Sequence, residues 1–228
     1  MITNDTKLSD IVLHDPSVVT VYNRFGIRLG VGDLTVAKVC QEKGLDTEFF
    51  LTILNTYIYD DYFPERIPAS VSAATIVDYL SQTNAYYAQG QIPNIERHFS
   101  FLISRSPSEN SNLGLMMKFF QEVKQQLLNR IDDDSRRWFP EVLAAEASAK
   151  IPQEIAINHA DSTEDSVEDK LDDLINMFVI HLKGDYDADL ARAVLLALVR
   201  LKKDIVQNNR IRERILRPFY HILNNKQS

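Results

Sequence analysis

Two stretches of this chain share one spacing, NRIDDDSRRWFP at residues 129–140 and NNRIRERILRP at residues 208–218. Superposing their prolines aligns Arg130 with Asn208 and Asp134 with Arg212. Positions four apart lie one turn apart on an α-helix, so each stretch presents two of these side chains on one helix face. Both stretches fall near the ends of helices predicted from the apolar pattern.

Four long segments carry apolar residues every three to four positions, which is typical of amphipathic helices. They cover residues 72–104, 106–131, 166–182 and 187–211. Pro93 is expected to kink or split the first of these helices. Residues 147–165 are polar and are expected to form a loop. The natural packing for four such segments is an antiparallel four-helix bundle over residues 69–228.

The first 62 residues predict a small domain of short helices. Asp15 and Asp46 are expected to cap helices, and Gly26 and Gly44 are expected to end them. Residues 59–68 contain two prolines, break the helical pattern and are interpreted as a linker. No useful strand alternation is present, so the predicted fold class is all-α.

The composition narrows the range of functions. The 228 residues are 45% hydrophobic and 25% charged, with a formal net charge of −7, which disfavours nucleic-acid binding. Cys40 is the only cysteine, so neither an internal disulfide nor a thiolate metal cluster is possible within one chain. Without a signal-peptide pattern or a long apolar run, the chain is expected to be cytoplasmic and not bound to a membrane.

The two proline-anchored stretches resemble the H-x3-E-x5-P segment found twice in the hemerythrin-like domain of the iron–sulfur cluster repair di-iron family. The segments LSDIV at residues 8–12 and YNRFGI at residues 22–27 look like the opening of that family's N-terminal domain. Where the family has a Cys-Cys-Gly-Gly motif, this chain has RLGVGDLT at residues 28–35. The resemblance implies a small helical domain followed by a hemerythrin-like bundle.

In that family each His and Glu of the repeated segment is an iron ligand. The matching positions here are Ala85, Arg130, Asp134, Asn208 and Arg212, none of them His. Asp134 alone could coordinate a metal through a carboxylate, so no catalytic, cofactor or metal site is predicted. If any metal binds, the weak candidate ligands are Glu96, His98 and Asp134. In the family register, Asp134 and Arg212 would face each other and could replace a metal cross-link with an ion pair.

Two functions follow as expectations. The favoured one is a non-enzymatic, metal-free protein that acts as a regulatory or interaction module in a stress-response setting, without a cofactor and with a protein partner. The alternative is a divergent iron-binding protein involved in repair of damaged iron–sulfur clusters. A DNA-binding regulator is disfavoured by the net charge and by the absence of a clear basic recognition helix.

Overall fold

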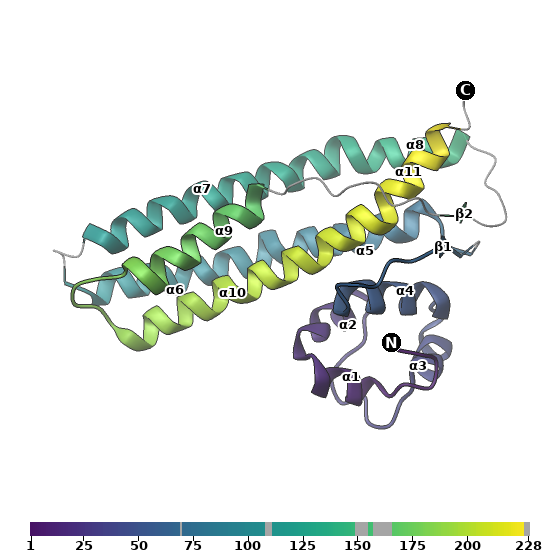
Figure 1. Cartoon of the computed structure of the whole chain (residues 1–228), viewed down its shortest axis with the longest axis horizontal. Coiled ribbons are helices and arrows are strands. Elements are labelled where there is room, and N and C mark those ends of the chain that lie inside the picture. Colours follow the sequence, from purple (N-terminus) through teal and green to yellow (C-terminus); the bar gives the residue numbers. More distant parts are fainter. Residues whose placement is uncertain (69, 108–110, 149–154, 157–165, 226–228) are drawn as a thin grey trace. The chain divides into compact units, whose positions relative to one another are not determined.

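The computed structural model describes residues 1–68, 70–107, 111–148, 155–156 and 166–225 (Figure 1). Within these ranges the protein is helical except for one short strand pair, so the predicted all-α class is confirmed. The described chain divides into two compact units. Unit 1 consists of Met1–Thr83, Arg137–Ser162 and Gln207–Ser228, and unit 2 of Asn84–Arg136 and Thr163–Val206. Each unit has its own apolar core.

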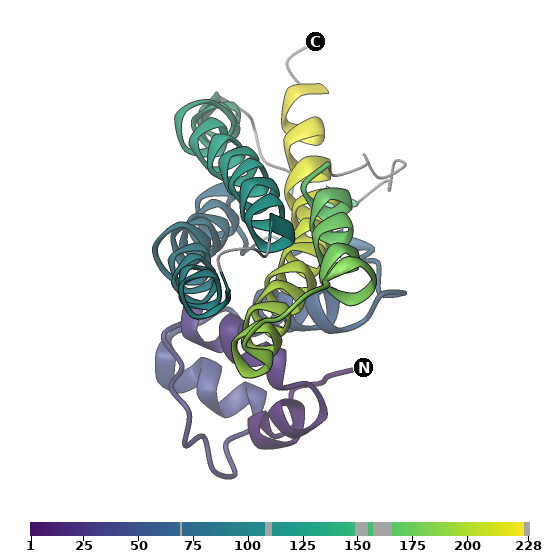
Figure 2. The same cartoon turned by 90° about the vertical axis from the view of Figure 1, so that its left-hand side faces the viewer.

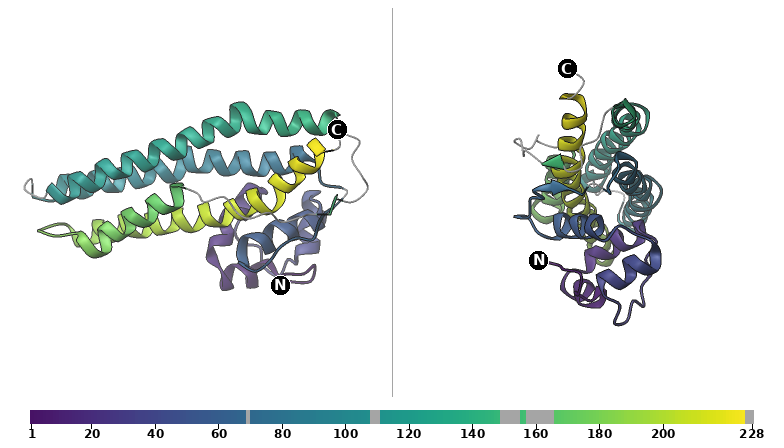
Figure 3. Two further views of the ribbon diagram at one scale, coloured as in Figure 1. Left: turned by 45° about the horizontal axis from the view of Figure 1, so that its top comes forward. Right: turned by 90° about the vertical axis from the view of Figure 1, so that its right-hand side faces the viewer.

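Unit 1 begins with the short helices expected near the N-terminus (Figure 3). These are α1 (Leu8–His14), a 3-10 turn η1 (Pro16–Val18), α2 (Val19–Arg24), α3 (Val36–Lys43) and α4 (Thr47–Ile58). The predicted caps are present: Asp15 accepts a hydrogen bond from the Ser17 amide at 3.0 Å, and Asp46 accepts one from the Phe49 amide at 2.7 Å. Gly44 ends α3 at φ 65°, a left-handed conformation that glycine adopts without strain.

Unit 1 also contains strand β1 (Arg66–Ile67), which pairs antiparallel with β2 (Ile155–Ala156). The expected linker at 59–68 is therefore partly ordered into a strand, and the side chain of Ile67 is buried. The expected loop at 147–165 is interrupted by β2, and its first two residues belong to helix α8 (Phe139–Ser148). The rest of that loop lies outside the described residues. The domain limits at 62 and 69 remain a prediction.

Unit 2 is built from helices that the apolar periodicity predicted (Figure 2). They are α6 (Ile92–Arg105), α7 (Ser111–Asp133), α9 (Ser166–Asn176) and most of α10 (Ala188–Ile211), whose residues from Gln207 onward belong to unit 1. Their apolar faces enclose one core, in which the Phe99 ring lies 5.9 Å from that of Phe120 and 5.4 Å from that of Phe178. Helix α5 (Ala73–Tyr86) is divided between the units at residues 83 and 84.

Each long helical run contains a π-helical segment, a feature that sequence reasoning missed. The four described segments are η2 (Tyr87–Gln91), η3 (Asp134–Trp138), η4 (Met177–His181) and η5 (Arg212–Leu216). Three of them end two residues before a proline, at Pro93, Pro140 and Pro218. A helix α11 (Arg217–Asn225) follows η5. Pro93 thus interrupts the regular α-helix as predicted, but through a wider turn, after which the helix continues.

The wider turn has a physical cause. In a regular α-helix a proline ring clashes with the carbonyl group four residues earlier. Here the residue before Pro93, Ile92, donates its amide to the carbonyl of Tyr87, and the residue before Pro218, Arg217, donates its amide to the carbonyl of Arg212. These i to i−5 bonds widen the turn at the point where the proline ring needs room.

Among the described residues, no helix is long and apolar enough to cross a membrane.

Candidate functional site

Asp134, one of the positions compared with the family's ligands, is the first residue of η3 and is only 2% exposed. The carboxylate oxygen Oδ2 accepts a hydrogen bond from Nδ2 of Asn84 at 2.9 Å, and Asn84 is itself buried. Both residues belong to unit 2. An ionised carboxylate is stable in a protein interior only where polar groups replace its hydration, and the Asn84 amide is one such group.

Asn208, which aligns with Arg130 when the two prolines are superposed, lies in unit 1 and is also buried. Its oxygen Oδ1 accepts hydrogen bonds from Nη1 of Arg24 at 3.2 Å and from the hydroxyl of Tyr79 at 3.1 Å. The Arg24 guanidinium also lies 5.6 Å from the centre of the Tyr79 ring and donates to the Tyr79 hydroxyl at 3.2 Å. The amide oxygen of Asn208 is thus held by two protein donors.

The remaining positions of the register supply no ligand either. Ala85 is exposed, and Arg130 is half-buried. Arg212 is half-buried, and its guanidinium carbon lies 4.6 Å from the centre of the Trp138 ring. Arg217 lies over the same ring at 5.9 Å. Arg212 and Trp138 belong to unit 1, whereas Asp134 belongs to unit 2, so the proposed Asp134–Arg212 ion pair remains a prediction.

The weak metal candidates in α6 are engaged differently. Glu96 accepts from the Lys124 ammonium with both oxygens at 2.8 Å and from the Gln121 amide at 2.9 Å. These hydrogen bonds, that of Lys124 first, hold the pKa of Glu96 below its usual value. His98 is half-buried two residues further on, about 200° around the helix from Glu96. Within the described residues, no three His, Cys, Asp or Glu side chains gather as a metal-binding group.

The donor set at the family's positions therefore does not fit a di-iron centre. Such a centre needs several imidazoles and carboxylates directed at one point. The chain supplies one alanine, two arginines, an amide whose oxygen accepts from Arg24 and Tyr79, and the carboxylate of Asp134, which accepts from Asn84.

Residues 28–35, compared above with the family's cysteine motif, form the connection between α2 and α3. Gly30 and Gly32 have φ of 90° and 52°, left-handed conformations that glycine adopts without strain in this connection. Nearby, Lys7 and Asp33 form an exposed ion pair at 2.7 Å. Cys40 on α3 is fully buried, and burial raises the pKa of its thiol, which makes the thiolate scarce. Cys40 therefore packs as a small apolar side chain.

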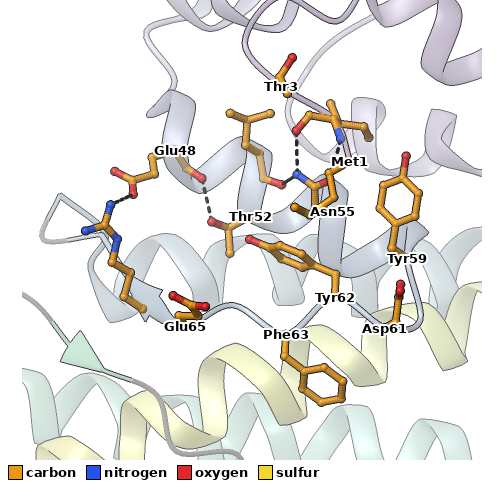
Figure 4. Close-up of a pocket in the computed structure, with 13 residues that line it drawn as sticks. Met1, Thr3, Glu48, Thr52, Asn55, Tyr59, Asp61, Tyr62, Phe63 and Glu65 are labelled. Atoms are coloured by element: carbon orange, nitrogen blue, oxygen red, sulfur yellow. Dashed lines mark hydrogen bonds and ion pairs between the residues drawn. The ribbon is translucent and has the colours of Figure 1, made fainter.

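A pocket of about 810 Å³ lies in unit 1 (Figure 4). Its wall comes from the first three residues, from α4 and from the segment after α4, and it includes Thr52, Asn55, Tyr59 and Tyr62. Asn55 fixes one side of the wall: it accepts from the Ile2 amide at 2.9 Å and donates to the Ile2 carbonyl at 3.1 Å. No residue of this pocket was predicted as a site.

The hydrogen-bond partners of Asn208 and Asp134 were not predicted from the sequence. Arg24 and Asn84 gave no signal, because each stands in an ordinary helical pattern and its partner is distant in sequence. The pocket had a weak signal, since residues 59–66 concentrate acidic and aromatic side chains after a helix end. Comparisons of this chain with protein-family models, with curated proteins and with solved structures find no match. Function is therefore inferred from the side chains and their geometry.

Proposed function

We propose that this protein is a non-enzymatic, metal-free helical module that acts through binding, with a hemerythrin-like antiparallel four-helix bundle as its larger part. The apolar faces of α6, α7, α9 and α10, which enclose one core, support the bundle. The regulatory and stress-response setting is supported by the resemblance to the iron–sulfur cluster repair family.

One observation carries the metal-free part of the proposal. At the buried position where the family has an iron ligand, the Asn208 oxygen accepts from Arg24 and from Tyr79. A metal ion would have to displace both donors and would then sit beside a guanidinium cation, which is electrostatically unfavourable. A neutral amide oxygen is also a poor ligand for iron compared with imidazole or carboxylate.

The test is elemental analysis of the chain purified from iron-rich medium, combined with a thermal-shift titration using Fe(II), Mn(II) and Zn(II). We expect iron well below one atom per chain, no ligand-to-metal absorption band, and no stabilisation by any of the three ions. Iron close to two atoms per chain would contradict the proposal. The alternative, a divergent iron-binding protein, predicts bound iron that the Asp134→Ala variant loses and that the Asn129→Ala variant, an exposed change on α7, retains.

A further inference from the structure

The pocket of unit 1 has walls whose polar groups are already engaged. Asn55 bonds to residue 2 and donates to the Leu51 carbonyl at 2.9 Å, and the Thr52 hydroxyl donates to the Glu48 carbonyl at 2.8 Å (Figure 4). The bonds between Asn55 and residue 2 join α4 to the N-terminal residues at the pocket wall, whereas the other two lie within α4. This part of the wall is therefore formed before any ligand binds. A ligand must make its polar contacts with the side chains at the mouth of the pocket, called the rim below.

The rim carries an excess of negative side-chain charge. Three carboxylates line the pocket, those of Glu48, Asp61 and Glu65, against the single guanidinium of Arg66. Arg66 lies 3.4 Å from Glu48, in a pair whose side chains are both more than half exposed. Such an exposed pair contributes little to stability and opens easily. Within the described part of the chain, no cation forms an ion pair with Asp61 or Glu65.

This negative charge affects the pKa of the Tyr62 phenol. Burial is the main cause that raises the pKa of Tyr62, and the negative charges of Glu48 and Glu65 raise it further. The Thr52 hydroxyl, within hydrogen-bonding reach, opposes the rise. Two of the three rim carboxylates thus act on the same aromatic side chain of the wall.

The neighbouring surface shows how an organic cation is held here. The Arg214 guanidinium lies 3.9 Å from the centre of the Phe63 ring and donates to the Tyr62 carbonyl at 2.7 Å. Burial, followed by the charge of Arg210, lowers the pKa of Arg214, and the negative charges of Asp60 and Asp61 oppose that lowering. An aromatic face combined with nearby carboxylates therefore already holds one cation of this chain, and Tyr59 and Tyr62 supply further aromatic surface inside the pocket.

We propose that this pocket binds a small organic cation through a primary ammonium group. The alkyl part lies against Tyr59 and Tyr62, and the ammonium group lies near Asp61 and Glu65. A volume of about 810 Å³ exceeds that of one alkylammonium group and accommodates a diamine or a lysine side chain with its flanking atoms. This pocket does not include the positions where the family would hold metal. The metal-content test of the proposed function and the ligand-binding test of this inference can therefore give opposite outcomes.

The test is isothermal titration of the full chain with 1,4-diaminobutane and, separately, with N-acetyl-lysine methylamide. The neutral control is 1,4-butanediol, which has a similar shape and no charge. We expect both cations to bind, the diol not to bind, and affinity to fall as salt is raised. Tighter binding of the diamine identifies a free polyamine as the natural type of ligand, and tighter binding of the lysine derivative identifies a lysine side chain.

The variant for this test is Asp61→Asn/Glu65→Gln, which keeps the shape of two exposed side chains and removes their charge. We expect it to weaken cation binding about tenfold, from roughly 0.7 kcal/mol per screened charge. The matched control is Glu122→Gln, an exposed acid on α7 outside the pocket, which should leave affinity unchanged. Absence of binding, equal binding of the diol, or an equal effect of the control would overturn the proposal.

Discussion

Asp134 and Asn84 show how one buried polar side chain is stabilised by another. A buried carboxylate without polar partners costs several kcal/mol, so its neighbours must compensate. Asn84 does so with one amide donor at 2.9 Å. In unit 1, the Asn208 oxygen is also an acceptor, but its donors are a guanidinium and a phenol. Two aligned stretches are therefore stabilised by unrelated polar contacts.

We expect Asn84→Ala to lower the free energy of unfolding by about 1–3 kcal/mol, because it removes a hydrogen bond from a buried carboxylate. Asn129→Ala, an exposed change on α7, should stay within about 0.5 kcal/mol of the parent. Chemical denaturation measures both. The double variant Asn84→Ala/Asp134→Ala should lose less than the sum of its single changes. Equal effects of Asn84→Ala and Asn129→Ala would show that the Asn84–Asp134 hydrogen bond contributes nothing to stability.

At the scale of the helices, the prolines account for three of the four described π segments. A π turn contains one more residue than an α turn, so it moves the carbonyl groups away from the proline ring. Pro93, Pro140 and Pro218 each follow such a segment at the same distance. The fourth segment, η4, has no proline and ends its helix at Leu182. The structure offers no physical reason for η4.

Deleting the exposed Gln89 from η2 tests this relation. The deletion should convert the π turn to an α turn and bring Pro93 against a carbonyl group, at a cost of about 3 kcal/mol. Adding Pro93→Ala should recover much of that loss, because alanine has no ring to clash with the carbonyl group and has an amide that can donate to it. Denaturation followed by circular dichroism measures both effects.

The control is deletion of Arg97, an exposed residue of α6 in regular α-helix. That deletion rotates every later position by about 100°, which turns Phe99 and Leu102 out of the core of unit 2. It should therefore be far more damaging than the combined Gln89 deletion and Pro93→Ala. If the two are equally damaging, the extra residue of η2 is not what accommodates the proline.

At the scale of the molecule, the compact units do not follow the order of the sequence. The core of unit 1 combines residues from α1 to α4 with Phe139 and Val142 of α8 and with Leu216 and Phe219 near the C-terminus. Phe25 at the end of α2 packs on Tyr79 of α5, with ring centres 5.4 Å apart. Residues 1–62 thus share their apolar core with segments that lie far along the chain.

A fragment of residues 1–62 distinguishes the domain limit predicted from sequence from the unit seen in the structure. A chain of about 60 residues buries little surface and is marginally stable even with an intact core. Since this fragment lacks Tyr79 and Phe219, we expect it to unfold with low cooperativity and a weak near-ultraviolet dichroism signal. The full chain is the reference. Cooperative unfolding of the fragment, with the aromatic signal retained, would support an independent domain at 1–62.

The sequence alone determined the features that depend on neighbours along the chain. Apolar spacing located the helices of unit 2, and side-chain oxygens of Asp15 and Asp46 located helix starts, because these interactions span only a few residues. The sequence also shows that no histidine stands at the positions compared with the family's ligands. Those conclusions require no knowledge of how helices pack.

Only the tertiary structure decided which polar groups meet. Arg24 and Asn208 are 184 residues apart, and Asn84 and Asp134 are 50 apart, so no periodic pattern links them. The π segments escaped prediction because each is only five residues long, too short to show a period of its own between the flanking α-helical residues. The pocket escaped prediction because its wall joins residue 2 to Asn55 and Tyr62, and a concave surface exists only after distant segments have packed.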